Sequence, residues 1–307
     1  MEQEKQDLVL IDGNAILHRA YHALPPLTTR SGELVNAVYG FATMLLKILQ
    51  EMKPKYIAVA FDTAKPNFRH QEYVGYQAHR PRTDAELVGQ IEKVYELVRA
   101  FNIPIFAVEG FEADDVIGTL AVQAPPGKVN EVVIVTGDRD LMQLVTEKIK
   151  LFMPTRGLSE GQLVGEKEVK EKMGVSPGKI VDYKGLVGDQ SDNYPGVPGI
   201  GPKTAVGLLE KFGRMENIYR SLDKVESKTV LAKLTEGAES AALSKKLATI
   251  LKNVPVTLDL EKCLAKDYDK GKVVEFFKEL GFRSLVNRLS GSAQKENEEE
   301  EHQPSLF

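Results

Sequence analysis

The sequence predicts an open α/β fold, with a mostly parallel sheet and flanking helices, followed by a helical domain. Four short apolar runs in the first half have the Val, Ile and Ala content of strands that are buried on both faces. Two segments between these runs, residues 36–51 and 87–101, repeat apolar residues at helical spacing. From about residue 165 to residue 290 the whole pattern is helical.

Each apolar run leads to acidic residues. The runs are, in chain order, Leu8–Ile11, Tyr56–Phe61, Ile103–Val108 and Val132–Val135. The acids that follow them begin with Asp12, Asp62, Glu109 and Asp138. In open parallel sheets, ligands bind beyond the carboxyl ends of the strands. We therefore expect these acidic regions to meet at one edge of the sheet.

The chain divides into three predicted parts. Residues 6–170 form the α/β domain, and residues 171–290 form the helical domain, which contains a segment rich in Gly, Pro and Asp at about 185–213. Residues 291–307 are polar and charged and have no apolar period, so we expect a disordered acidic tail.

The composition excludes several classes of protein. Apolar residues make up 42% and charged residues 27% of the 307 residues, as in ordinary folded domains. No apolar stretch reaches the ~18 residues of a membrane span, and the first residues lack the apolar core of a signal peptide, so we predict a cytoplasmic protein without a membrane partner. The single cysteine, Cys263, excludes a multi-cysteine zinc site.

The net charge of −4 conceals a neutral main part. Residues 291–307 carry five Glu and one Lys, which leaves 39 basic and 39 acidic residues in residues 1–290. A neutral balance alone does not indicate nucleic-acid binding. If nine clustered acids bind cations, however, the same residues hold 39 bases against 30 remaining acids.

Nine carboxylates are expected to converge at the strand ends and in the Gly-rich segment. They are Asp12, Asp62, Glu112, Asp114, Asp115, Asp138, Asp140, Asp189 and Asp192. Taken singly, each of these acids is explained equally well as a helix cap. Packed together, they repel one another and must take up protons or bind cations. Carboxylate oxygens without His or Cys favour Mg²⁺ or Mn²⁺, and paired ions ~4 Å apart are a common device for phosphodiester cleavage.

The motifs around these acids occur in an order that carries a family resemblance. The matching segments are Ile11–Asn14, Asn36–Phe41, Phe61–Asp62, Phe68–His70, Glu112–Asp115, Thr136–Leu141, Gly188–Asn193 and Pro195–Thr204. Over about residues 7–290 the chain closely resembles the 5′-nuclease (5′-3′ exonuclease) domain of bacterial DNA polymerase I, in the flap endonuclease superfamily. The resemblance implies a PIN-like α/β catalytic domain with a helical arch, and then a helical domain with a helix–hairpin–helix-type DNA-binding element.

The resemblance also implies an activity and its cofactors. The expected enzyme is a structure-specific 5′-3′ exonuclease and 5′-flap endonuclease that also removes RNA primers, in DNA replication and repair. It would use two or more Mg²⁺ ions, replaceable by Mn²⁺, held by the nine carboxylates, which would all be catalytic. One ion would lie near Asp12, Asp62, Glu112 and Asp114, and Asp115, Asp138, Asp140, Asp189 and Asp192 would complete the second cluster, partly through waters.

Residues 196–205 resemble a hairpin that grips the phosphates of duplex DNA without reading its sequence. Glycines let backbone N–H groups approach a phosphate closely, and the next helix start adds its dipole. The expected contacts are Gly199, Gly201, Lys203 and Thr204. In the family this loop also holds a K⁺ ion. A plain Gly/Pro turn between two helices is the alternative.

Residues 64–82 combine basic and aromatic side chains, a mixture that suits a single strand held by charge and stacking. In the family this stretch leads into the arch through which the free 5′ strand passes. The expected DNA contacts are Arg69, Tyr76, Gln77, Arg80, Arg82 and, after the first strand, Arg19. A solvated loop is the alternative.

One position departs from the family pattern Tyr-Lys-x-x-Arg, whose Lys approaches the scissile phosphate. Here the pattern has Gln77 in place of the Lys, whereas Arg80, which we expect to act in catalysis, is retained. The loss of a cation favours, as the alternative function, a catalytically weak or inactive DNA-junction-binding protein. An RNA-cleaving relative with the same acidic core is a third interpretation, disfavoured by the duplex-binding hairpin.

The last five residues resemble the sliding-clamp-binding motif of bacterial replication proteins. Gln303, Leu306 and Phe307 occupy the positions of the motif, and Pro304 departs from the usual Leu. We expect a tether to the bacterial sliding clamp, DNA with 5′ flaps, nicks or RNA primers as the substrate, and a monomer associated with the nucleoid. The sequence leaves open whether the protein stands alone or is a cut polymerase.

Overall fold

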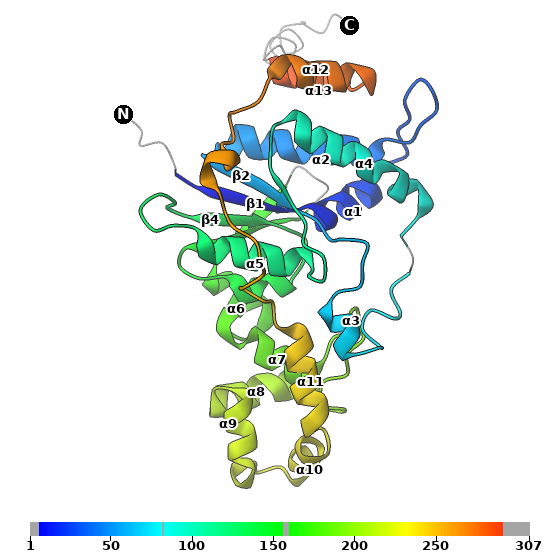
Figure 1. Ribbon diagram of the computed structural model, residues 1–307. Helices are drawn as coiled ribbons and strands as arrows, with labels where there is room; N and C mark the ends of the chain where they lie inside the picture. The colour runs from blue at the N-terminus through cyan, green and yellow to red at the C-terminus, as the bar shows by residue number, and fades with distance from the viewer. Residues whose placement is uncertain (1–5, 82, 156–159, 291–307) are drawn as a thin grey trace, which may run out of the picture.

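The computed structural model describes residues 6–81, 83–155 and 160–290, which form a six-stranded sheet with helices on both faces and a helical region beside it (Figure 1). The strand order is β3-β2-β1-β4-β5-β6, and all neighbouring strands are parallel except β5 and β6. The strands are β1 Leu8–Asp12, β2 Tyr56–Ala60, β3 Ile105–Phe106, β4 Val132–Val135, β5 Ile149–Pro154 and β6 Gly161–Val164. This confirms the predicted fold class.

The described helices fall into three groups along the chain. The first group is α1 Gly13–Ala23, α2 Asn36–Lys47, α3 Phe68–Glu72, α4 Ala85–Ala100 and α5 Ala113–Gln123. The second group is α6 Glu166–Met173, α7 Ile180–Val187, α8 Pro202–Phe212, α9 Met215–Arg220, α10 Lys228–Glu236 and α11 Ala238–Ala248. The third group is α12 Lys270–Glu279 and α13 Arg283–Ser290. A π-helical turn, Ile48–Met52, extends α2.

The four predicted apolar runs all form strands, but the sequence does not predict β5 and β6. Buried and half-buried residues mix along β5, and three of the four residues of β6 are exposed, so neither has a continuous apolar run. β3 is reduced to two residues. The stretch expected to form a helical arch contains one short helix, α3.

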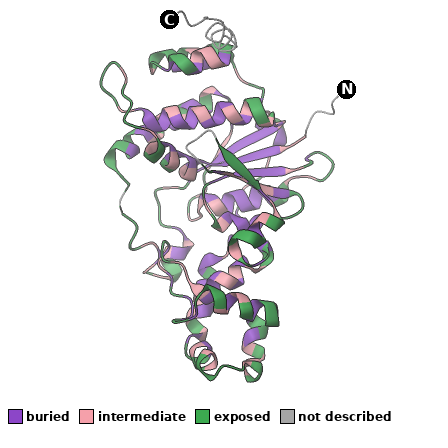
Figure 2. Ribbon diagram, turned by 180° about the vertical axis from the view of Figure 1, so that it is seen from behind, coloured by how far each residue is buried: buried purple, intermediate pink, exposed green. Residues whose placement is uncertain are grey.

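Alternate residues of the central strands pack into two different cores, as the pleat of a strand requires. Figure 2 shows these strands as buried. On β1, Val9 and Ile11 pack with α1, α2 and α4, whereas Leu8 and Leu10 pack with α5. The core on the α5 side continues into the helical region. The central sheet is therefore rigidly held from both faces, which fixes the ends of its strands.

The last two helices return to the sheet domain. α12 and α13 pack against α4 and α2, on the far side of the sheet from α6–α11 (Figure 1). Phe277 and Phe282 are buried in the same core as α2. The predicted helical domain of residues 171–290 thus contains two helices that pack on the α/β domain, and the predicted boundary at residue 170 falls within α6. Among the described residues, no helix is long and apolar enough to cross a membrane.

The turn between α7 and α8 has two glycines that no other residue can replace without strain. Gly188 and Gly196 both have positive φ, at 77° and 63°. Their backbones touch, because a Cβ at Gly188 would lie 2.5 Å from the carbonyl carbon of Pro195 and one at Gly196 would collide with the amide nitrogen of Gly188. The close approach lets Val197 N donate to Leu186 O at 2.8 Å and closes the hairpin.

We expect Gly196→Ala to destabilise the protein by about 2 kcal/mol or more, since it adds a clash to a left-handed backbone. Gly207→Ala is the matched control, because Gly207 is exposed within α8 and a Cβ there meets nothing within 4 Å. Helix propensity predicts that this control is neutral or stabilising by up to ~1 kcal/mol. Urea unfolding measures both, and equal behaviour of the two variants would contradict the hairpin assignment.

Candidate active site

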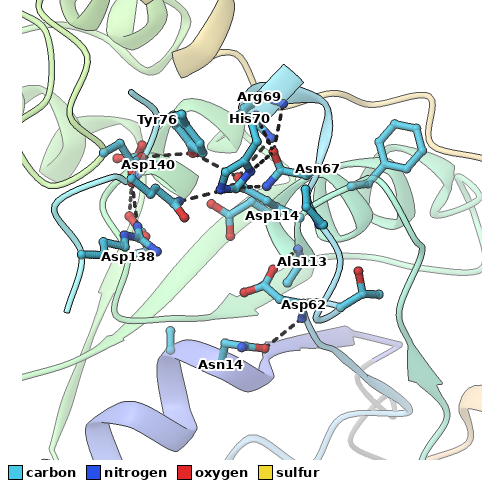
Figure 3. Close-up of a pocket in the computed structure, with 18 of the residues that line it drawn as sticks. Asn14, Asp62, Asn67, Arg69, His70, Tyr76, Ala113, Asp114, Asp138 and Asp140 are labelled. Carbon is cyan, nitrogen blue, oxygen red and sulfur yellow. Dashed lines mark hydrogen bonds and ion pairs between the residues drawn. The ribbon is translucent and has the colours of Figure 1, made fainter. Parts of the chain in front are cut away.

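A cavity of about 630 Å³ opens at the carboxyl edge of the sheet. Seven of the nine predicted carboxylates line it: Asp12, Asp62, Glu112, Asp114, Asp138, Asp140 and Asp192. They come from the ends of β1 and β2, the start of α5, the segment after β4 and the loop between α7 and α8. Figure 3 shows Asp62, Asp114, Asp138 and Asp140 around this cavity. The structure therefore brings together residues that are up to 180 positions apart in the sequence.

Backbone donors and one hydroxyl hold the carboxylates that follow β1 and β4. Asp12 caps α1 by accepting from Ala15 N at 3.0 Å, and its other oxygen accepts from the Thr136 hydroxyl at 2.7 Å. Thr136 in turn accepts from Asp138 N at 2.9 Å. Asp138 then accepts from Asp140 N at 2.8 Å. Asp12 can therefore both cap α1 and line the cavity. Thr136 holds the carboxylates in place, although it was not among the site residues predicted from the sequence.

Asp62 is fixed between two helices. Its backbone N donates to the side chain of Asn14 on α1 at 2.9 Å, and its carboxylate accepts from Ala113 N, the first residue of α5, at 2.7 Å. Figure 3 shows these residues on the same side of the cavity. Asn14 belongs to the Ile11–Asn14 motif that the sequence analysis identified. The sequence did not indicate that its side chain accepts a hydrogen bond from Asp62 N.

Several of the crowded carboxylates have a pKa above that of a free acid, so they stay protonated to a higher pH. Burial, opposed in part by hydrogen bonds, raises the pKa of Asp12 to about 7. Burial also raises the pKa of Glu112 to about 7, with repulsion from Asp62 and Asp115 adding to it. The pKa of Asp114 is raised by burial and by the charges of Asp138 and Asp12. A cation in this cavity would relieve the repulsion and restore the charged forms.

Arg69, which lines the cavity, forms a buried ion pair with Asp115, which does not. Two nitrogens of Arg69 bind the two oxygens of Asp115 at 2.7 and 2.9 Å, and a third contact reaches Glu112 at 3.0 Å. The remaining donors go to the carbonyls of Leu247 and Thr249, both at 2.8 Å. Arg69 is 2% exposed and Asp115 fully buried.

This pair bears on two predictions made from the sequence, and both stay predictions. Arg69 lines the cavity, but it is 2% exposed and protein oxygens take its donors. Asp115 does not line the cavity, since Arg69 and Leu251 N occupy its oxygens. Both residues position Glu112 and the neighbouring chain. The sequence could not show that a basic residue in the arch segment points inward.

The segment from Tyr76 to Arg80 closes one side of the cavity. Tyr76 is 3% exposed, and its hydroxyl donates to Glu112 at 3.3 Å and to Asp192 at 3.4 Å. Gln77 adopts a left-handed backbone with φ of 54° and donates to the same two acids at 3.3 and 3.2 Å. Arg80 contacts Asp192 at 2.7 Å with about half of its side chain exposed.

Lys184 on α7 lies between two of the predicted metal ligands. Its ammonium contacts Asp140 and lies 2.7 Å from Asp189, and the residue is 5% exposed. Burial would raise the pKa of Asp189, but Lys184 and the Ser191 hydroxyl lower it to about 2. Asp140 keeps a raised pKa of about 6, because burial outweighs the attraction of Lys184. Lys184 was not among the site residues predicted from the sequence.

The other predicted DNA contacts lie away from the cavity. Gly199, Gly201 and Lys203 are exposed at the hairpin before α8, and Thr204 is half-buried. Arg19 is half-buried and lines a neighbouring groove on α1. Arg82 and the three motif residues of the tail, Gln303, Leu306 and Phe307, lie outside the described residues, as does the predicted acidic tail.

The donor set fits hydrated, hard divalent ions. Within residues 6–81, 83–155 and 160–290, no three His, Cys, Asp or Glu side chains are arranged to hold an ion directly. Mg²⁺ retains several waters and reaches many of its ligands through them. The seven carboxylates in the lining and the raised pKa values indicate a site that needs positive charge. In addition, the buried hydroxyl of Tyr194, near Asp140 and Asp189, has no hydrogen-bond partner.

Two family models match consecutive parts of the chain. The one described as the 5′-3′ exonuclease, N-terminal resolvase-like domain, matches residues 7–174. The one described as the 5′-3′ exonuclease, C-terminal SAM fold, matches residues 175–271. The first covers the sheet and α6, and the second covers the hairpin and the helical region.

Curated relatives are 37–45% identical to the chain over the aligned residues. DNA polymerase I of Bacillus caldotenax is 44% identical over 292 residues, which are 95% of this chain and 33% of the relative. DNA polymerase I of Caldicellulosiruptor bescii is 45% identical over 284 residues, 92% of this chain and 33% of the relative. The chain thus spans about a third of the length of these relatives.

Solved structures share the fold at lower identity. The T5 5′-exonuclease with bound zinc ions has a TM-score of 0.68 at 19% identity, and the match covers 94% of this chain and 98% of that chain. Flap endonuclease-1 from Methanococcus jannaschii has a TM-score of 0.57 at 20% identity, with 93% and 91% covered. At this level of identity the likeness shows a common fold.

We expect Mg²⁺ to raise the melting temperature more at about pH 8 than at about pH 5. The raised pKa values of Asp12, Glu112 and Asp140 mean that the folded state binds more protons than the unfolded state between about pH 4 and pH 7. Metal-free stability therefore falls as the pH rises through that window, and cations offset the fall. Thermal unfolding in EDTA and in Mg²⁺ measures this, and an equal shift at both pH values would contradict it.

Proposed function

Because the chain belongs to the 5′-3′ exonuclease family, whose members are metal-dependent nucleases, we propose that it hydrolyses DNA phosphodiesters near 5′ ends, at flaps, nicks and RNA primers. The observation that carries the proposal is the convergence of seven carboxylates on one cavity at the sheet edge. Their chemistry suits divalent ions beside a phosphate. The exposed hairpin supports a duplex substrate.

The carboxylates would hold the ions in two groups. The proximal cluster is Asp12, Asp62, Glu112 and Asp114, and the distal cluster is Asp138, Asp140, Asp189 and Asp192. When bound, Mg²⁺ or Mn²⁺ would stabilise the charge that develops on the phosphate. Asp115 would act indirectly, since it holds Arg69 against Glu112.

Arg80 is the cation best placed to meet the substrate phosphate. It lines the cavity, its side chain is half exposed, and its ion-pair partner among the described residues is Asp192. Gln77 lies between Glu112 and Asp192, where it can donate but carries no charge. The segment is anchored, because Gln77 N donates to Asp192 O at 2.9 Å and Asn193 donates to Gly75 O at 2.7 Å. We therefore assign the retained charge of this segment to Arg80.

The hairpin before α8 would hold the duplex part of the substrate. Gly201 precedes Pro202 at the helix start, and the exposed Lys203 follows, so backbone N–H groups and one charge face outward together. The family resemblance adds a K⁺ ion at this turn. Lys233 already donates to the Gly199 carbonyl at 2.9 Å, so K⁺ would use the other carbonyls of the turn.

A second candidate is a DNA-junction-binding protein with weak or no cleavage. The observation that favours it is the uncharged Gln77 in the position that carries Lys in the family. Cleavage of a 5′-flap duplex in Mg²⁺, compared with EDTA, separates the two. Turnover in Mg²⁺ supports the nuclease, and tight binding without turnover supports the junction binder.

Asp62→Ala and Asp138→Ala are each expected to abolish flap cleavage in Mg²⁺ while leaving flap binding in Ca²⁺ within a few-fold. The two acids serve the chemical step, whereas the hairpin and basic surface hold the DNA. Glu109→Ala is the matched control, since Glu109 pairs with Lys65 at the surface and does not line the cavity. Single-turnover cleavage and filter binding measure these effects, and full activity in either aspartate variant would end the assignment.

Arg80→Ala should lower single-turnover cleavage by roughly a hundredfold or more, in the range seen when a transition-state donor is removed. Gln77→Lys should change the rate by less than about threefold, because Arg80 already supplies the charge. Arg99→Ala, at an exposed pair remote from the cavity, is the control. If Gln77→Lys instead accelerates cleavage tenfold and Arg80→Ala does not impair it, the assignment of the two roles is wrong.

We extend the proposal to the partner and location of the protein. Residues 303–307 would bind the bacterial sliding clamp, with Leu306 and Phe307 in an apolar pocket and Gln303 at its edge. Such a tether keeps a monomeric, cytoplasmic nuclease near the nucleoid DNA that a clamp encircles. Titration of a peptide of residues 290–307 against the clamp should show micromolar binding that Leu306→Ala with Phe307→Ala removes. Binding that ignores these changes, or no binding, would refute it.

A further inference from the structure

Lys184 is the most deeply placed cation of the distal cluster. It projects from α7, is 5% exposed, and contacts one oxygen of Asp140 and one of Asp189. Burying an ammonium costs several kcal/mol unless anions compensate it, so this lysine is held there by the two acids. Its contacts identify it as a counter-ion of predicted metal ligands rather than as part of a hydrophobic core.

The two clusters differ in how much of their charge the protein itself neutralises. In the distal cluster, Lys184 touches two acids and Arg80 touches Asp192 at 2.7 Å. In the proximal cluster, the ion pair among the described residues is the one that Arg69 makes with Glu112, and Arg69 is shared with Asp115. The distal cluster therefore has more positive charge built into it, and a divalent ion there gains less from its ligands.

Tyr194 offers the ammonium a second acceptor. Its hydroxyl is buried without a partner, and its backbone pairs with that of Asp189, the acid that Lys184 contacts, through two hydrogen bonds at 2.8 and 3.0 Å. A buried hydroxyl without a partner is costly, so a neighbouring donor that moves toward it is favoured. Lys184 can thus leave Asp140 without losing all of its hydrogen bonds.

We propose that Lys184 is an internal, displaceable counter-ion that weakens the binding of the distal divalent ion, so that the proximal ion binds first and the distal ion binds only as the ammonium moves toward Tyr194. Lys184 is a positioning residue in this account, since it acts through the carboxylates. The inference rests on the proposed metal-dependent function and adds an order of ion binding to it.

The test counts Mn²⁺ ions on the complete chain by calorimetry and by electron paramagnetic resonance. The wild type should show one tighter and one weaker class of site. Lys184→Met and Lys184→Gln should both tighten the weaker class by about tenfold or more and leave the tighter class unchanged, because a repelling charge is gone. Lys184→Arg, which keeps the charge, should resemble the wild type. Two neutral variants guard against one that fails to fold.

Lys245→Met is the matched control. Lys245 also bridges two acids of the helical region, Asp182 on α7 and Glu216 on α9, but neither acid is a predicted metal ligand. Its loss should leave Mn²⁺ binding unchanged. In EDTA, Lys184→Met should lower the melting temperature, since Asp140 and Asp189 then face each other unpaired, and Mn²⁺ should restore it.

The outcomes separate this inference from the proposed function. If the wild type binds Mn²⁺ but both neutral variants bind it identically or more weakly, the counter-ion role is refuted and the nuclease proposal stands. If Tyr194→Phe fails to weaken the distal ion further, the displacement toward Tyr194 is wrong. If no Mn²⁺ binds to the wild type at all, both proposals fail together.

Discussion

The crowding of carboxylates at one edge of the sheet is the constraint on which the rest of the structure depends. Parallel strands end together, so the acids that follow β1, β2 and β4 share one cavity. Burial makes this costly, as the raised pKa values of Asp12 and Glu112 show. Three kinds of group partly compensate this cost: the backbone N–H groups at helix starts, the Thr136 hydroxyl, and the buried cations Arg69 and Lys184. These hold the acids in place and leave the cavity in need of positive charge.

The buried pair of Arg69 and Asp115 links three parts of the chain that are far apart in sequence. Arg69 belongs to the segment between β2 and α4, Asp115 begins α5, and the carbonyls of Leu247 and Thr249 end α11. Removing one member of such a pair leaves a buried charge uncompensated, typically at 3–5 kcal/mol. The pair thus sets where Glu112 lies and where the arch segment approaches the cavity. The same contacts therefore hold the site residue Glu112 and pack α11 against the sheet domain.

Much of the site could be predicted because its signals are local. Apolar runs that lead to Asp12, Asp62 or Asp138 predict both a strand and the carboxylate that follows it. Because parallel strands end at the same edge of a sheet, these carboxylates are expected to lie together. The direction in which a side chain points could not be predicted. Arg69 and Tyr76 point into the protein because acids far away in the sequence bind them there. Lys184 was missed for the same reason, since a lysine within a helix has no sequence signature of its partners. β5 and β6 lacked continuous apolar runs.

The central claim is that this cavity is built to hold divalent ions beside a phosphodiester. Anomalous diffraction from crystals grown in Mn²⁺ at a concentration that supports cleavage tests it most directly, because it places the ions without reference to activity. We expect Mn²⁺ peaks within the cavity, one near Asp12 and Asp114 and one near Asp138 and Asp192. Mn²⁺ peaks only elsewhere on the protein, with none among these acids, would contradict it.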